Sequence, residues 1–72
     1  MKKYYQIDGD NNLFATLRDA KHHIYVAYTE RERVKYLQGC YISCVRNEEV
    51  VSVTPIHIDA EGGYSFGKTR RY

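Results

Sequence analysis

The segment CYISCVRNEEVVSVTPIHID, residues 40–59, decides the fold of this 72-residue chain. It contains two runs rich in β-branched residues, 40–46 and 50–59, separated by the polar residues NEE. Such runs are typical of β-strands, and a connection this short allows only an antiparallel pairing. The sequence therefore predicts a β-hairpin, which the turn AEGG extends into a third strand over 64–72.

The alternation of apolar residues slips within the second of these runs. Val51 and Val53 share one parity, whereas Ile56 and Ile58 have the other. One extra residue near Pro55 would bring both pairs onto the same face of the sheet. We therefore expect a β-bulge at Pro55, which also lacks the amide hydrogen that a regular central strand needs.

Two helices are expected before the hairpin. The apolar residues of 17–28 fall on one helical stripe, and Thr16 precedes them as an N-cap. Thr29 opens a second, shorter helix through a capping box with Glu32, and Gly39 ends it. The two helices thus follow one another directly in the chain.

A β-prone segment at 3–8 completes the element order βααβββ. The sequence predicts a single α+β domain over residues 1–72, because a chain of this length has one small core. We expect a small two-layer sandwich, in which both helices pack on one sheet face and the last three strands form an antiparallel meander. The other face of the sheet would stay partly open.

Charge and hydropathy exclude several classes of protein. The net charge of +2, from eleven Lys and Arg against nine Asp and Glu, is too small to indicate nucleic acid by itself. The start MKKYYQIDGD has no apolar run of the signal-peptide kind, and no segment reaches the roughly 18 apolar residues of a membrane span. We expect a cytoplasmic protein with no membrane partner, whose two cysteines stay reduced.

The segment GGYSFGKT, residues 62–69, matches the phosphate-binding loop of nucleotide hydrolases. That loop works because a helix begins where it ends and directs its positive end at the phosphates. Only three residues follow Thr69, too few for a stable helical turn. We therefore expect a turn and a strand here, and no bound nucleotide.

No arrangement of residues indicates catalysis or a metal. On a strand, Cys40 and Cys44 are about 13 Å apart, too far to share one zinc ion or to form a disulfide. His22 and His23 diverge by about 100° on a helix, and we expect both to be exposed. The charged run ERERVK, 30–35, is expected to be a solvated face. The chain is thus predicted to be a non-enzymatic protein without catalytic residues, metal or cofactor.

The open sheet face is the first candidate for a contact surface. If Cys40, Ile42 and Cys44 face the helices, alternate residues of the first two strands face outward. Tyr-bearing, uncharged surface of this kind is typical of contact sites. We therefore expect a protein partner, or a second copy of the chain, to bind at the protein-contact candidates Tyr4, Tyr41 and Val45.

The last strand supports an alternative, a small nucleic-acid-binding module. Tyr64 and Phe66 share a face that Lys68 and Arg70 would continue, with Arg71 joining from the other side. Aromatic rings interleaved with cations can stack bases and bind phosphates. The side chains that would carry this alternative are Tyr64, Lys68, Arg70, Arg71 and Tyr72, although core positions facing the helices are expected for Tyr64 and Phe66.

Overall fold

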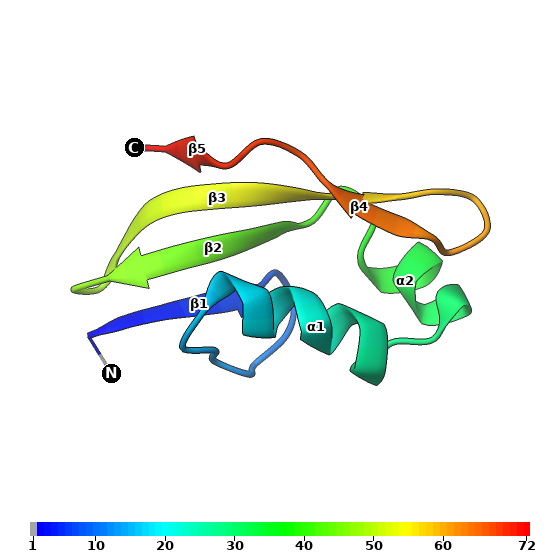
Figure 1. Cartoon of the computed structure of the whole chain (residues 1–72), viewed down its shortest axis with the longest axis horizontal. Helices are drawn as coiled ribbons and strands as arrows, with labels where there is room; N and C mark the ends of the chain where they lie inside the picture. Colours follow the sequence, from blue (N-terminus) through cyan, green and yellow to red (C-terminus); the bar gives the residue numbers. More distant parts are fainter. Residues whose placement is uncertain (1) are drawn as a thin grey trace.

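The computed structural model describes residues 2–72 and combines a curled antiparallel sheet with two helices (Figure 1). The predicted α+β class is confirmed. In chain order, the elements are β1 (Lys3–Ile7), α1 (Leu17–Ala27), α2 (Glu30–Tyr36), β2 (Tyr41–Arg46), β3 (Glu49–Ile58), β4 (Tyr64–Phe66) and β5 (Arg70–Arg71).

The long strand β3 organises the sheet. Its neighbours give the order β1-β2-β3-β4, and β5 pairs with β3 beside β4. The outer edge of β1 is covered by Phe14, whose backbone N–H and C=O bond Tyr5 at 2.9 and 2.8 Å. Along the opposite edge, β4 and β5 have no further partner strand within residues 2–72. The two edges of the sheet are therefore protected to different degrees.

The predicted last strand over 64–72 is two strands, because one extra residue interrupts it. Phe66 pairs with Ile56 and Arg70 with Val53, so four steps along this segment match three along β3. Side chains before and after the interruption consequently lie on opposite faces. The expectation that Tyr64, Phe66, Lys68 and Arg70 share a face was wrong.

The bulge in β3 is not where the sequence predicted it. Pairing with β2 is regular at Pro55, and the register shifts instead beside Cys44, where Val51 is the extra residue. Thr54 explains the error, since it is 3% exposed and its hydroxyl lies 2.8 Å from that of Thr69. Thr54 and Ile56 both face the core, so the strand alternates regularly here, but the polar Thr54 does not appear in the apolar pattern.

The core lies between α1 and the sheet. α1 contributes Ala20 and Ile24, and the strands contribute the buried isoleucines. Tyr64 and Phe66 pack against this core, as expected for large aromatic residues. The fully buried cluster comprises Ile7, Ala20, Ile24, Leu37, Ile42 and Ile56.

The predicted helix caps are confirmed. Thr16 accepts a hydrogen bond from the Asp19 amide at 3.1 Å. Thr29 and Glu32 form a complete capping box, in which each side chain bonds the other residue's backbone amide. The left-handed Gly39, with φ of 73°, follows the end of α2.

Arg33 corrects the expectation that the whole ERERVK run is solvated. Its side chain is 8% exposed and donates to the carbonyl oxygens of Ile24 at 3.2 Å, Tyr25 at 3.3 Å and Gly62 at 2.9 Å. The first two carbonyls belong to the last turn of α1, which has no basic residue of its own. Arg33 therefore caps α1 and joins it to the turn between β3 and β4.

Gly62 allows the turn between β3 and β4 to pack against α2. Figure 1 shows this turn beside α2. The φ of Gly62 is +87°, and a Cβ added to it would lie 2.5 Å from the Cβ and carbonyl oxygen of Glu30. Only glycine fits this conformation in so little space. The first glycine of the apparent phosphate loop is thus required by packing.

Candidate binding site

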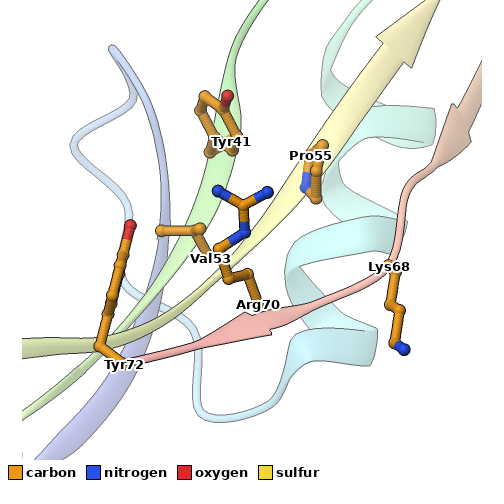
Figure 2. Close-up of a pocket in the computed structure, with 6 residues that line it drawn as sticks. All are labelled: Tyr41, Val53, Pro55, Lys68, Arg70 and Tyr72. Carbon is orange, nitrogen blue, oxygen red and sulfur yellow. The ribbon is translucent and has the colours of Figure 1, made fainter.

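A hollow of about 300 Å³ lies on the face of the sheet opposite α1 (Figure 2). Pairing places Val53 opposite both Ser43 and Arg70, on the outward face, because the flanking Ile42 and Thr54 are buried. The hollow is lined by Tyr41, Val53, Pro55, Lys68, Arg70 and Tyr72, which come from β2, β3 and the C-terminal segment.

The hollow combines two tyrosine rings with two cations. Figure 2 shows the Arg70 guanidinium pointing toward Tyr41, with Val53 between it and Tyr72, whereas the Lys68 side chain lies on the side away from Tyr72 and points away from the hollow. Tyr41 is 43% exposed and Tyr72 78%. Among the described residues, no Asp or Glu side chain lines the hollow, and neither cation forms an ion pair within 4.0 Å. These donors and rings are free to contact a ligand.

The protein-contact candidates are unequally available. Tyr4 and Val45 face each other across β1 and β2, on the same side of the sheet as the hollow. Val45 is only 9% exposed and Tyr4 is half-buried, so both offer limited surface. Tyr41 is the member of this set that lines the hollow.

The nucleic-acid candidates are divided by the fold. Lys68, Arg70 and Tyr72 line the hollow together. Tyr64 lies on the helix-facing side, with its ring 4.9 Å from the Arg33 guanidinium, and Arg71 faces that side as well. Tyr41, a protein-contact candidate, therefore lines the same hollow as three nucleic-acid candidates, Lys68, Arg70 and Tyr72.

A hydrogen-bonded cluster around Asp10 was missed by the sequence analysis. Its Oδ2 accepts from the Tyr28 hydroxyl at 2.7 Å and from His23 Nε2 at 3.1 Å, and its Oδ1 accepts two bonds from Asn12. His23 is consequently half-buried, which corrects the expected exposure, while His22 is exposed. The cluster attaches the loop after β1 to α1, and the sequence separation of its members left no local signal.

Burial and hydrogen bonding act against each other on these groups. Burial by itself would raise the pKa of Asp10, but the bonds from Asn12 and Tyr28 and the nearby His23 lower it overall. Burial first, and then the bond to Asp10, raise the pKa of Tyr28 to about 12. Asp10 is therefore an ionised acceptor held by donors, an arrangement that stabilises structure and is unsuited to a general base.

The cysteines occupy the inward face, as predicted. Cys44 is buried in β2, and Cys40, just before this strand, donates its S–H to the Tyr36 carbonyl at 3.3 Å. Burial, and then Asp8, raise the pKa of the Cys40 thiol, which disfavours the nucleophilic thiolate. Within residues 2–72, no three His, Cys, Asp or Glu side chains gather as a metal site.

Residues 62–69 form a turn, the strand β4 and an irregular connection. Directly after Thr69, Arg70–Arg71 are extended as β5, where a phosphate-binding loop would begin a helix. The strand expected in place of a phosphate loop is therefore present at Tyr64–Phe66.

Comparison of the chain with protein-family models, with curated proteins and with solved structures finds no match. In the part of the chain that the structure describes, no helix is long and apolar enough to cross a membrane.

Proposed function

We propose that this chain is a small, non-enzymatic binding module that holds single-stranded nucleic acid in the hollow. The observation that carries the proposal is that Arg70 and Lys68 line one hollow together with Tyr41 and Tyr72, with the Arg70 guanidinium beside the Tyr41 ring. Cations attract the phosphate backbone, and each stacked base contributes roughly 1–3 kcal/mol on an aromatic ring. The hollow suits an unstacked base, which a single strand offers and a duplex does not.

The chemistry of the hollow favours nucleic acid over the protein partner that the sequence placed first. An uncharged tyrosine surface was the reason to expect a protein, but Tyr41 lies beside Arg70 and shares the lining of the hollow with Lys68 as well. Lysine is depleted at protein interfaces, although tyrosine and arginine are enriched there. Phosphate and base together account for both kinds of side chain.

The proposal also takes up two wider expectations about the molecule. It treats the fold as a two-layer sandwich with both helices on one face, which leaves the hollow open to solvent. It further places the protein in the cytoplasm, where the thiols of Cys40 and Cys44 stay reduced and single-stranded RNA is present.

The test is titration of short, labelled single-stranded oligonucleotides at low and at high salt. We expect binding at low salt, and Tyr72→Ala should weaken it by roughly 1–3 kcal/mol, one stacking interaction. Arg70→Gln should reduce the slope of log K against log salt by about 0.7, one phosphate contact. The exposed Arg18 on α1 provides a matched control, since Arg18→Gln should change neither quantity. No binding at low salt would refute the proposal.

Self-association is the second candidate, and the free edge of the sheet is the observation that favours it. β4 and β5 have no outer partner strand within residues 2–72, so their backbone groups could pair with those of a second copy. Sedimentation at two protein concentrations tests this idea, because the average molecular mass of a self-associating protein rises with concentration. A monomer at both concentrations would exclude it.

A further inference from the structure

A second hollow, of about 430 Å³, lies on the other side of β5. Arg71 pairs with Ser52, which pairs in turn with Cys44, so Arg71 faces the side of the sheet that carries the core. Lys3 of β1 and Arg46 of β2 line this hollow with it. Each of three strands thus contributes one cationic residue to the lining of this hollow, and the Lys3 ammonium lies 5.7 Å from the centre of the Tyr5 ring.

This gathering of positive charge is unfavourable in the free protein. Lys3 and Arg46 are direct cross-strand partners, and like charges in that position destabilise a sheet. Glu49 is the partner of Arg46 on the other side, but it does not line the hollow and forms no ion pair within 4.0 Å with any of residues 2–72. In the described residues, no Asp or Glu side chain lines this second hollow, so the charge of its side chains is complementary to an anion.

The two hollows are connected at the end of the chain. Tyr72 lines both of them, and Arg70 and Arg71 are adjacent residues whose side chains point to opposite faces of β5. Figure 1 shows β5 at the outer edge of the sheet, where no further strand blocks a passage from one face to the other. A flexible chain of phosphates could therefore cross this edge.

We propose that the second hollow binds phosphates of the same single strand whose base occupies the first hollow. The nucleic acid crosses the edge at β5, with Arg70 holding it on one face and Arg71, Arg46 and Lys3 on the other. This inference rests on the proposed function, and it adds the path of the strand and a second set of contacts.

Oligonucleotide length separates the two hollows. The probes are oligothymidylates of about three and about twelve nucleotides, which fall below and within the usual range of single-strand site sizes. Two phosphate contacts in the first hollow predict a salt slope of about −1.4, and five contacts in both hollows a slope of about −3.5. We expect the lower slope for the short probe and the steeper one for the long probe.

Substitutions then assign the contacts. Arg71→Gln and Arg46→Gln should each reduce the slope for the long probe by about 0.7 and leave the short probe unchanged, with Arg46 the weaker case because Glu49 is near it. Arg70→Gln should weaken both probes. Circular dichroism of each variant checks that the fold is retained, and Arg18→Gln serves as the control.

The possible failures are distinguishable. If Arg70→Gln weakens binding but Arg71→Gln and Arg46→Gln leave the long probe unchanged, the second hollow is not used and the proposed function stands. If Arg71→Gln weakened binding of the short and the long probe equally, the inference would also be overturned, because Arg71 would then act on the first hollow. Absence of binding to either probe would refute the proposed function and this inference together.

Discussion

Two arginine-bearing regions of this small molecule differ in what their guanidinium groups contact. Arg33 in α2 is buried and bonded to three carbonyl oxygens, whereas Arg70 and Arg71 in β5 are exposed. Both regions read as charged runs, ERERVK and KTRRY. The difference shows that an arginine is structural when its donors are used inside the fold, and available for a ligand when they are not.

The contrast has an energetic basis. A buried guanidinium is costly unless its N–H groups are paired, and Arg33 meets this condition through Ile24, Tyr25 and Gly62. Its charge also lies at the negative end of the α1 dipole. The arginines of β5 keep their hydration, so removing them should cost little stability and much of any affinity for an anion.

The largest effect is expected where the Arg33 region is most crowded. Gly62→Ala combines a strained positive φ with a Cβ forced against Glu30, and should destabilise the fold by about 3–5 kcal/mol. Gly9→Ala is the matched control, because Gly9 has a similar φ of +80° with nothing within 4 Å, and should cost about 1–2 kcal/mol. Urea denaturation measures both. Equal losses would mean that the turn does not pack closely on α2.

The next largest effect on stability tests the contrast between the buried Arg33 and the exposed arginines of β5. Arg33→Met should destabilise the fold by about 2–3 kcal/mol, because it leaves carbonyl oxygens of α1 and of the turn unpaired. Arg31→Met, at an exposed position of the same helix, and Arg70→Gln should each stay within about 0.5 kcal/mol. Thermal and urea unfolding report these values. A loss for Arg70→Gln as large as that for Arg33→Met would show that both regions are structural.

The smallest effect concerns the Asp10 cluster, which is also held by internal hydrogen bonds. Tyr28→Phe removes a bond to a carboxylate and should cost about 1–2 kcal/mol near neutral pH. Because folding raises the pKa of Tyr28 from 10.0 to about 12, its contribution is complete below pH 10 and is lost as pH rises towards 12.

The same substitution has an acid limb. Folding lowers the pKa of Asp10, so the bond contributes above the ordinary value of 3.8 and weakens as pH falls through the lower folded value. The difference in unfolding free energy between Tyr28→Phe and the parent should therefore shrink at both extremes of pH. Tyr36→Phe, at an exposed ring, is the control and should show no such dependence. A difference that is constant with pH would contradict the assigned bond.

Local patterns predicted the elements that local interactions hold. The strand at 41–46 follows from its alternation, and the start of α2 follows from the capping box of Thr29 and Glu32, because the residues involved are neighbours in sequence. The burial of Arg33 was not predictable in this way, since its acceptor in the β3–β4 turn is 29 residues distant. In the sequence, a charged run that contains a buried arginine cannot be distinguished from one whose residues are all exposed.

The candidate site shows the same limit. Its two tyrosines and two cations were identified from the sequence, but in two separate groups, whereas Val53 and Pro55 were not among the candidates. Tyr41 meets Arg70 because β3 lies between β2 and β5, and Arg70 faces outward because one extra residue separates it from Phe66. Neither the strand order nor the position of the extra residue can be recognised in the sequence of the C-terminal segment.

The sequence by itself determined the α+β class, the helix caps and the strand at Tyr64–Phe66 that stands in place of a phosphate loop, since each follows from interactions between near neighbours. Tertiary structure alone decided which arginine is consumed by carbonyl groups, which faces the C-terminal cations occupy, and that rings and charges share one hollow. Those outcomes depend on which distant strands become adjacent and in what register, and a shift of a single residue turns a side chain to the opposite face.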